Sequence, residues 1–178
     1  MKNKTMWICH TAIGTALFVA LAMCLRVPVF ENFYLCLGYI SLVVYAGFWG
    51  SSSGALIGGL GVILYCLLTG GVRGMPGWAA GNVLIGVMLG QGMKMISGRK
   101  TTWKQVVLLL ALMLLSCALG ILGVKSLVEC LLYAQPMVVR MVKNFYAFAA
   151  DTFVMWIAVP IYLLIRRKTS HAGQFAQQ

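Results

Sequence analysis

The chain has 178 residues, of which 61% are hydrophobic and only 10% are charged. A soluble domain carries about a quarter charged residues because its exterior faces water. This composition therefore excludes an ordinary soluble globular protein and indicates an integral membrane protein. Fourteen Lys and Arg residues stand against three acids, which gives a formal charge of +11. The cations lie between and beyond apolar runs, so membrane topology explains them better than binding to nucleic acid does.

The sequence lacks the patterns that carry catalysis or bind metals. Its six cysteines show no metal-ligand spacing and no disulfide framework, and most lie inside apolar runs. The motifs of serine hydrolases, zinc proteases and phosphate-binding loops are missing as well. We therefore predict that the chain is not an enzyme and has no resident cofactor or metal.

A helix needs about 20 apolar residues to cross about 30 Å of hydrocarbon. Six such runs predict an all-α integral membrane fold, a compact bundle of six transmembrane helices at residues 6–25, 33–49, 54–72, 75–93, 106–124 and 145–165. The run 126–139 is too short to span and contains Glu129 and Pro136, so we expect an interfacial segment there. Residues 1–168 form the predicted membrane domain, and residues 169–178 form a short polar cytoplasmic tail.

The basic residues predict the orientation, because Lys and Arg near helix ends are retained on the cytoplasmic side. With the N-terminus inside, the inner segments hold nine of these cations and the outer loops hold five, which favours N-in and C-in. The first run could instead be a signal peptide, since Ala20-Leu21-Ala22 resembles a cleavage site. Its length favours a membrane helix.

Small residues recur at four-residue spacing in several of the runs. Such stripes are flat, so another helix backbone can approach them closely. We expect the glycine stripes, such as Gly54 with Gly58, to pack inside the bundle. Ala12, Ala16 and Ala20 form a similar stripe on the first run. These alanines could pack within the chain, or they could form an external face for a membrane partner.

Polar side chains at membrane depth are costly, so each is a candidate for function. Arg140, Asn144 and Asp151 lie within about 40° of one helix face and predict a polar stripe that descends from the outer surface. An internal ion pair, or a capping arrangement at the start of the helix, is the alternative. Further cations and aromatic or amide groups approach the same end, and such a mixture suits a small, partly anionic, ring-containing solute. The candidate binding residues are Arg26, Tyr39, Arg73, Trp78, Asn82, Arg140, Lys143, Asn144 and Asp151.

The chain resembles the substrate-specific S components of energy-coupling factor (ECF) transporters, small membrane proteins through which prokaryotes capture vitamins and related micronutrients. The alanine stripe looks like the AxxxA surface of that family, and Leu25-Arg26-Val27-Pro28 looks like the RxP junction that often follows it. The Gly-rich second and third runs, and Pro76-Gly77-Trp78 before the fourth, are similar as well. So is the entry to the last run, from Pro136 to Asn144.

The resemblance implies a specific mode of action. The chain would bind its substrate from outside, with the loops around 26–34 and 70–77 as a lid, in the cytoplasmic membrane of a prokaryote. Ala12, Ala16 and Ala20 would dock onto a transmembrane coupling subunit bound to two cytoplasmic ATPases. The chain lacks the Asp that many folate and riboflavin types carry near residues 62–65. Folate, riboflavin, pyridoxine, pantothenate and a queuosine precursor therefore remain open as substrates.

Two other functions remain open from the residues themselves. A self-contained small transporter or channel, working as a homo-oligomer, would use Asp151 as its coupling site and the glycine stripes as oligomer contacts. A membrane-embedded enzyme or assembly factor is disfavoured because the sequence has no catalytic constellation.

Overall fold

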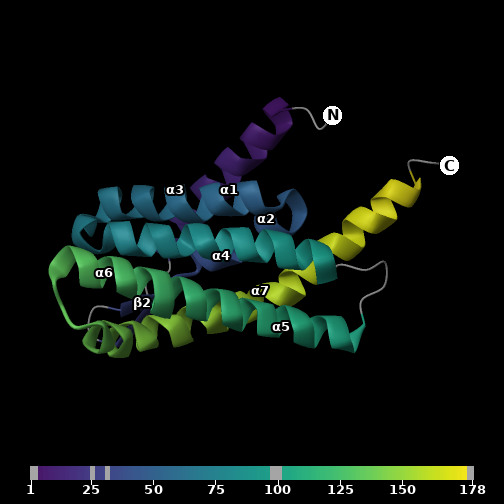
Figure 1. The fold of residues 1–178 in the computed structure, drawn as a ribbon. Helices are drawn as coiled ribbons and strands as arrows, with labels where there is room; N and C mark the ends of the chain where they lie inside the picture. The colour runs from purple at the N-terminus through teal and green to yellow at the C-terminus, as the bar shows by residue number, and fades with distance from the viewer. Residues whose placement is uncertain (1–3, 25–26, 31–32, 97–101, 176–178) are drawn as a thin grey trace.

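A computed structural model describes residues 4–24, 27–30, 33–96 and 102–175, and these residues form an almost entirely helical bundle (Figure 1). Five helical segments of the described chain are long and apolar enough to cross a membrane. The expectation of a helical, membrane-type protein is therefore confirmed. The elements are α1 (Lys4–Cys24), β1 (Val27–Phe30), β2 (Phe33–Leu35), α2 (Gly38–Trp49), α3 (Ser51–Thr69), η1 (Val72–Gly74), α4 (Met75–Ile96), α5 (Trp103–Cys117), η2 (Ala118–Lys125), α6 (Ser126–Tyr133) and α7 (Met137–Phe175).

The second predicted span differs from the structure in its first part. Phe33–Leu35 forms a strand that pairs antiparallel with Val27–Phe30, as aromatic and β-branched residues favour. Helix α2 therefore begins only at Gly38 and has 12 residues. At 1.5 Å per residue it is about 18 Å long, which is shorter than a bilayer's hydrocarbon core. The hairpin lies at the start of α2 and packs against α7.

The run 126–139, expected as an interfacial segment leading into the last helix, is divided between α6 and the start of α7, and its position at the interface stays a prediction. Helix α5 continues through η2, a π-helical stretch, into α6, so that Trp103–Tyr133 is one helical segment of 31 residues. At the end of this π-helical stretch, the Ser126 hydroxyl donates a hydrogen bond to the carbonyl of Ile121, five residues earlier, at 3.2 Å. The last helix also runs on to Phe175, so most of the predicted tail continues α7.

Helix α4 lies at the centre of the bundle and packs against α2, α3, α5 and α6. Its contact with α3 is made backbone to backbone, as the glycine stripes predict. A Cβ atom added to Gly54 would lie 2.5 Å from the carbonyl oxygen of Gly86, and one added to Gly81 would lie 2.5 Å from that of Gly120 in η2. Any larger residue at these positions would push the helices apart.

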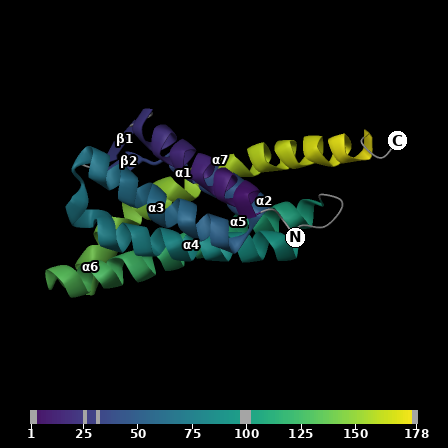
Figure 2. The same cartoon turned by 90° about the horizontal axis from the view of Figure 1, so that it is seen from above.

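The chain termini lie at one end of the bundle, and the hairpin and connecting turns lie at the other (Figure 1). Both chain termini lie at one end, where α1 and α7 diverge, and the hairpin and α6 lie at the opposite end (Figures 1 and 2). Gly70 ends α3 at this second end in a left-handed conformation, with φ of 75°. The chain then turns through η1 into α4, whose second residue, Pro76, needs no hydrogen-bond partner for its nitrogen.

We predict that Gly54→Ala lowers the free energy of unfolding by about 1–3 kcal/mol, because the added methyl group meets a backbone carbonyl that cannot move independently. Thermal unfolding of the detergent-purified protein would measure the change. Gly123→Ala is the matched control, since no atom lies within 4 Å of the Cβ position there. Equal melting temperatures for the two variants would contradict the proposed packing.

Candidate functional site

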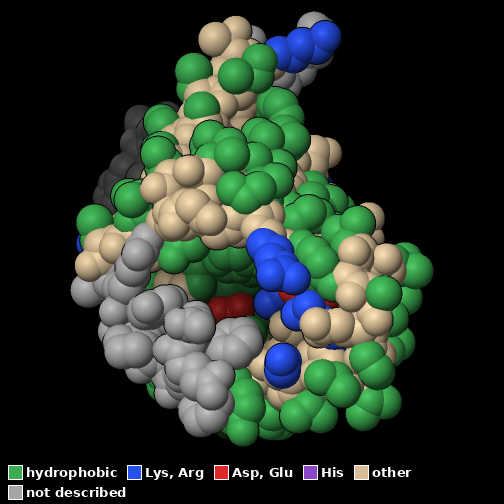
Figure 3. Space-filling model, turned by 90° about the vertical axis from the view of Figure 1, so that its left-hand side faces the viewer, with side chains coloured by type: hydrophobic (Ala, Val, Ile, Leu, Met, Phe, Trp, Pro, Cys, Tyr) green, Lys and Arg blue, Asp and Glu red, His purple; other side chains and the backbone are tan. Residues whose placement is uncertain are grey.

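The end of the bundle opposite the termini is hollowed (Figure 3). Among the described residues, an acidic side chain lies in the depth of the hollow beside hydrophobic side chains, and Lys and Arg side chains line one side. Figure 3 looks onto the end formed by the hairpin, η1, α6 and the first turns of α4 and α7. Candidate residues from these elements can therefore meet around one cavity.

Aromatic side chains from three helices meet at this end. Tyr39, at the start of α2, is fully buried, and its hydroxyl accepts a hydrogen bond from the indole nitrogen of Trp78 on α4 at 3.2 Å. The ring of Tyr65 on α3 meets Trp78 edge to face, with the ring centroids 5.6 Å apart. The sequence predicted Tyr39 and Trp78 only at the same end of the bundle, and the structure joins them directly.

Asn82 lies one turn after Trp78 and is fully buried. Its amide nitrogen donates to the Trp78 carbonyl at 3.0 Å, but its side-chain oxygen has no hydrogen-bond partner within the part of the chain that the structure describes. Buried polar atoms nearly always have a partner, in the protein, in water or in a ligand. The Asn82 oxygen is therefore an acceptor that a bound molecule could use.

Glu129 on α6 anchors a buried polar network with the entry of α7. Its carboxylate accepts a hydrogen bond from the Asn144 amide at 3.1 Å and lies 3.6 Å from the Arg140 guanidinium. The Asn144 amide also donates to the Ser126 hydroxyl at 3.0 Å. The polar stripe predicted on α7 thus contains the ion pair that the sequence left open as an alternative. The Nε atom of Arg140 remains buried without a protein partner.

Tyr133, at the end of α6, lies between two arginines. The guanidinium carbons of Arg73 and Arg140 lie 5.4 Å and 5.3 Å from its ring centroid, within the range of a cation–π contact. The Tyr133 hydroxyl also donates to the Arg73 carbonyl. These contacts link η1 to the start of α7 across the end of α6.

Asp151 lies about two turns after Asn144 on α7 and is only 4% exposed. The positive charge of Lys125 and the hydroxyl of Tyr39 both stabilise the charged form of its carboxylate. Lys125 in turn lies in the field of Glu129, Asp151 and Arg140. Lys125, from a different segment, therefore offsets part of the cost of burying this acid.

The predicted residues therefore fall into several groups. Tyr39, Trp78 and Asn82 join through direct contacts, and Arg140 and Asn144 meet at Glu129. Lys143 is exposed on α7, Arg73 is exposed on η1, and Arg26 lies outside the described residues.

Sequence reasoning missed Glu129, Ser126 and Tyr133 as parts of this site and counted Lys125 only as a loop cation. The residues were overlooked because 126–139 was predicted to lie at the interface. The spacing of Lys125 and Glu129 was a usable signal, since opposite charges four residues apart lie on one face of a continuous helix.

The alanine stripe of α1 lies away from the hollow. Ala12, Ala16 and Ala20 are exposed along the helix. Beside them, a depression of about 400 Å³ is lined by Ala12 and Ala16 together with leucines of α3, Leu56 and Leu60 among them. The stripe is thus an external apolar surface of the described chain.

Comparison with known proteins gives two matches. The profile of the family described as "ECF-type riboflavin transporter, S component" matches residues 2–167. Among solved structures, the chain is similar to the S component for biotin from an ECF-type ABC transporter, with a TM-score of 0.62, 16% identity, and coverage of 94% of this chain and 95% of that chain. At this identity the structural likeness shows the fold alone. No curated protein matches at a significant level.

We predict that Glu129→Gln lowers the free energy of unfolding by about 1–3 kcal/mol, because it leaves the partly buried Arg140 guanidinium without its anion. The double variant Glu129→Gln, Arg140→Gln is expected to recover part of this loss, since it removes both charges. Thermal unfolding in detergent, followed by tryptophan fluorescence, measures both. If the double variant lost as much free energy of unfolding as the two single variants together, Glu129 and Arg140 would not be coupled.

Proposed function

Because this chain belongs to the family of S components of ECF-type riboflavin transporters, we propose that it captures a water-soluble vitamin or related micronutrient outside the cell and delivers it through an ATP-driven coupling module. Membership in this family confirms the resemblance drawn from the sequence. The proteins of the family are transport subunits and not enzymes. The substrate and the partners of this particular chain are proposals.

The hollow at the end of the bundle carries this proposal. The Asn82 side-chain oxygen and the Arg140 Nε are buried and have no hydrogen-bond partner among the described residues. We assign both atoms to the wall of the hollow, where an acceptor and a donor can orient a small solute through directed hydrogen bonds. We therefore assign the substrate to this hollow.

The charges and rings favour a class of substrate. Among the described residues at this end, the cations Arg73, Lys125, Arg140 and Lys143 outnumber the acids Glu129 and Asp151. The excess of positive charge favours a carboxylate, a phosphate or another electron-rich group on the substrate. The rings of Tyr39, Tyr65 and Trp78 favour an aromatic or other flat ring system beside it. Riboflavin, named in the family description, and biotin, named for the similar structure, both contain rings.

The topology follows from the same proposal. Both termini lie at one end of the bundle, which requires an even number of membrane crossings (Figure 1). Five long segments with the shorter α2 give six crossings within residues 1–168. Lys94, Lys104, Arg167 and Lys168 belong to the end that carries the termini, so we place that end in the cytoplasm of a prokaryotic cell. The hollow then opens to the outside.

The alanine stripe is the proposed docking face for the transmembrane coupling subunit, which would bring two cytoplasmic ATPase subunits. Its exposure supports this role, because small residues allow a second helix backbone to approach closely within a bilayer. Packing within the chain, the other explanation of the alanines, does not account for their exposure.

Native mass spectrometry of the purified chain should detect one tightly bound vitamin from a panel of riboflavin, biotin, folate, pyridoxine and pantothenate. We expect Asn82→Ala to weaken that binding at least about tenfold, because it removes a buried hydrogen-bonding group. Quenching of tryptophan fluorescence provides an independent measurement, since Trp78 lies beside the proposed site.

Lys104→Gln, on an exposed position of α5 at the opposite end, is the control and should bind normally. Retention of no vitamin, or unchanged affinity in Asn82→Ala, would contradict the assigned site. A stable homodimer that transports substrate without an ATPase partner would instead favour a self-contained transporter.

Ala16→Trp should prevent copurification with the coupling subunit and leave vitamin affinity unchanged, because a large ring on the stripe blocks backbone contact but lies away from the hollow. Leu108→Trp is the matched control, since Leu108 is 53% exposed on α5, away from the stripe. Normal complex formation by Ala16→Trp would show that the alanines are not the docking face.

A further inference from the structure

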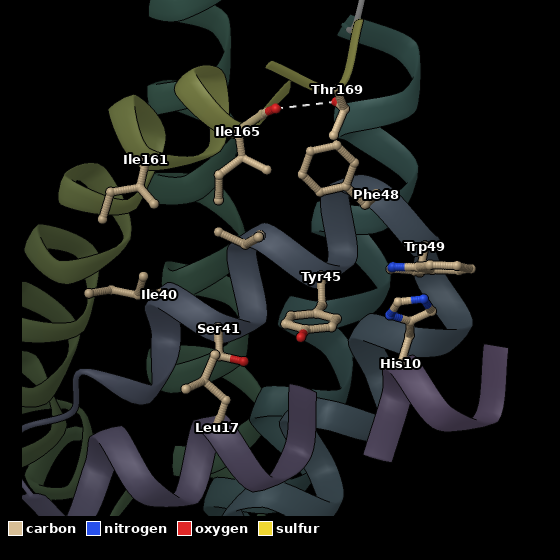
Figure 4. A pocket seen from close by; sticks show the side chains of 11 residues that line it. His10, Leu17, Ile40, Ser41, Tyr45, Phe48, Trp49, Ile161, Ile165 and Thr169 are labelled. Carbon is tan, nitrogen blue, oxygen red and sulfur yellow. Dashed lines mark hydrogen bonds between the residues drawn. The ribbon is translucent and has the colours of Figure 1, made fainter. Parts of the chain in front are cut away.

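A second cavity lies on the side of the bundle, between α1, α2 and α7, apart from the hollow at the end. Its volume is about 630 Å³, and Figure 4 shows side chains from all three helices around it. Most of its walls are aliphatic or aromatic, with Leu17 from α1, Ile40, Val44 and Phe48 from α2, and Ile161 and Ile165 from α7. We call this cavity the lateral groove.

The lateral groove lies at membrane depth. The α1 and α7 walls belong to membrane-spanning segments, and α2 is itself an apolar helix. Leu17 and Ile165 at its edges are 42% and 39% exposed, so apolar side chains continue outward from the groove. From Ile40 to Trp49 the α2 wall extends about 14 Å at 1.5 Å per residue. An apolar groove of this length fits an acyl chain better than it fits a water-soluble molecule.

One end of the groove is basic. Ile161, Ile165 and Thr169 line it from α7 at four-residue spacing. Lys168 follows Ile161 by seven residues and therefore lies near this helix face, whereas Arg166 lies about 100° and Arg167 about 160° around the helix from Ile165. No acid occurs in α7 after Asp151, and the described acids, Glu129 and Asp151, belong to the hollow.

Aromatic groups with polar tips complete this end. His10 of α1 stacks on Trp49, the last residue of α2, with ring centroids 4.1 Å apart (Figure 4). Tyr45 lines the groove beside them. Such side chains are typical of the boundary between hydrocarbon and headgroups, where one part of the ring is apolar and another is hydrated.

We propose that the lateral groove binds an anionic phospholipid. One acyl chain lies along the apolar walls, and the phosphate lies at the basic end, where Lys168, with Arg166 at the side of the lining face, supplies positive charge. Two signals, an apolar channel and a cluster of cations, select an anionic lipid from the bulk bilayer, because neutral lipids match only the first.

The groove is separate from the alanine stripe. His10 and Leu17 lie about 120° and about 100° around α1 from the centre of Ala12, Ala16 and Ala20. A lipid in the groove and a protein on the alanine stripe can therefore be bound at the same time. The bound lipid would fill the space between the diverging ends of α1 and α7.

The test is native mass spectrometry of the full chain after delipidation and addition of palmitoyl-oleoyl phosphatidylglycerol or the matching phosphatidylcholine. We expect one phosphatidylglycerol to be retained, at least fivefold more than phosphatidylcholine. The variant Arg166→Gln, Lys168→Gln should lose this preference. The control Lys94→Gln, Lys104→Gln removes the same charge from exposed positions on α4 and α5 and should keep it.

A groove-filling variant, Val44→Trp, adds a test of the apolar walls and should lower retention of both lipids while the protein remains folded by circular dichroism. If it does not fold, the two charge variants still decide the question. Equal retention of the two lipids, equal losses in both charge variants, or no retained lipid would overturn the proposal. So would a homodimer that persists without lipid and is broken by Val44→Trp, since a second copy would then occupy the groove.

Discussion

The close approach of α3 and α4 is the contact on which the rest of the structure depends. Lipid tails are as apolar as leucine, so helices in a bilayer associate through close packing more than through hydrophobic burial. Gly54 and Gly86 allow this packing, and Gly81 and Gly120 extend it to η2. Helix α4 is therefore held between two neighbours along most of its length. Its first turns carry Trp78 to the end of the bundle, so the geometry of the hollow follows from glycine contacts deeper in the core.

The second constraint is the cost of charge inside a membrane. Among the described acids, Glu129 forms an ion pair with Arg140, and the charge of Lys125 offsets part of the cost of burying Asp151. The Glu129–Arg140 pair also connects α6 to α7. The polar groups near this end are not all satisfied, because the Asn82 side-chain oxygen has no hydrogen-bond partner among the described residues. A polar network that is satisfied except at its open side is well suited to bind a polar solute, because the solute supplies the missing interactions.

The three surfaces of the protein lie on different parts of the bundle, which bears on how it would work in a complex. The hollow uses the first turns of α4 and α7, the alanine stripe uses one face of α1, and the lateral groove uses another face of α1 with α2 and α7. A vitamin, a protein partner and a lipid would thus not compete for the same atoms. Helix α1 adjoins both the stripe and the groove, so lipid in the groove can affect how α1 is presented to a partner.

The sequence by itself determined the membrane class, the approximate helical runs, the internal packing of the glycines and most of the polar residues near the hollow. It could do so because composition and helical periodicity are local properties of the chain. Local periodicity could not reveal that Phe33–Leu35 pairs as a strand, or that the helix continues through η2 to Tyr133. It also could not reveal that Glu129 meets Asn144 and that Tyr39 meets Trp78. Only the tertiary structure decided these features, because each depends on contacts between segments far apart in the sequence, whose register is set by how the helices pack.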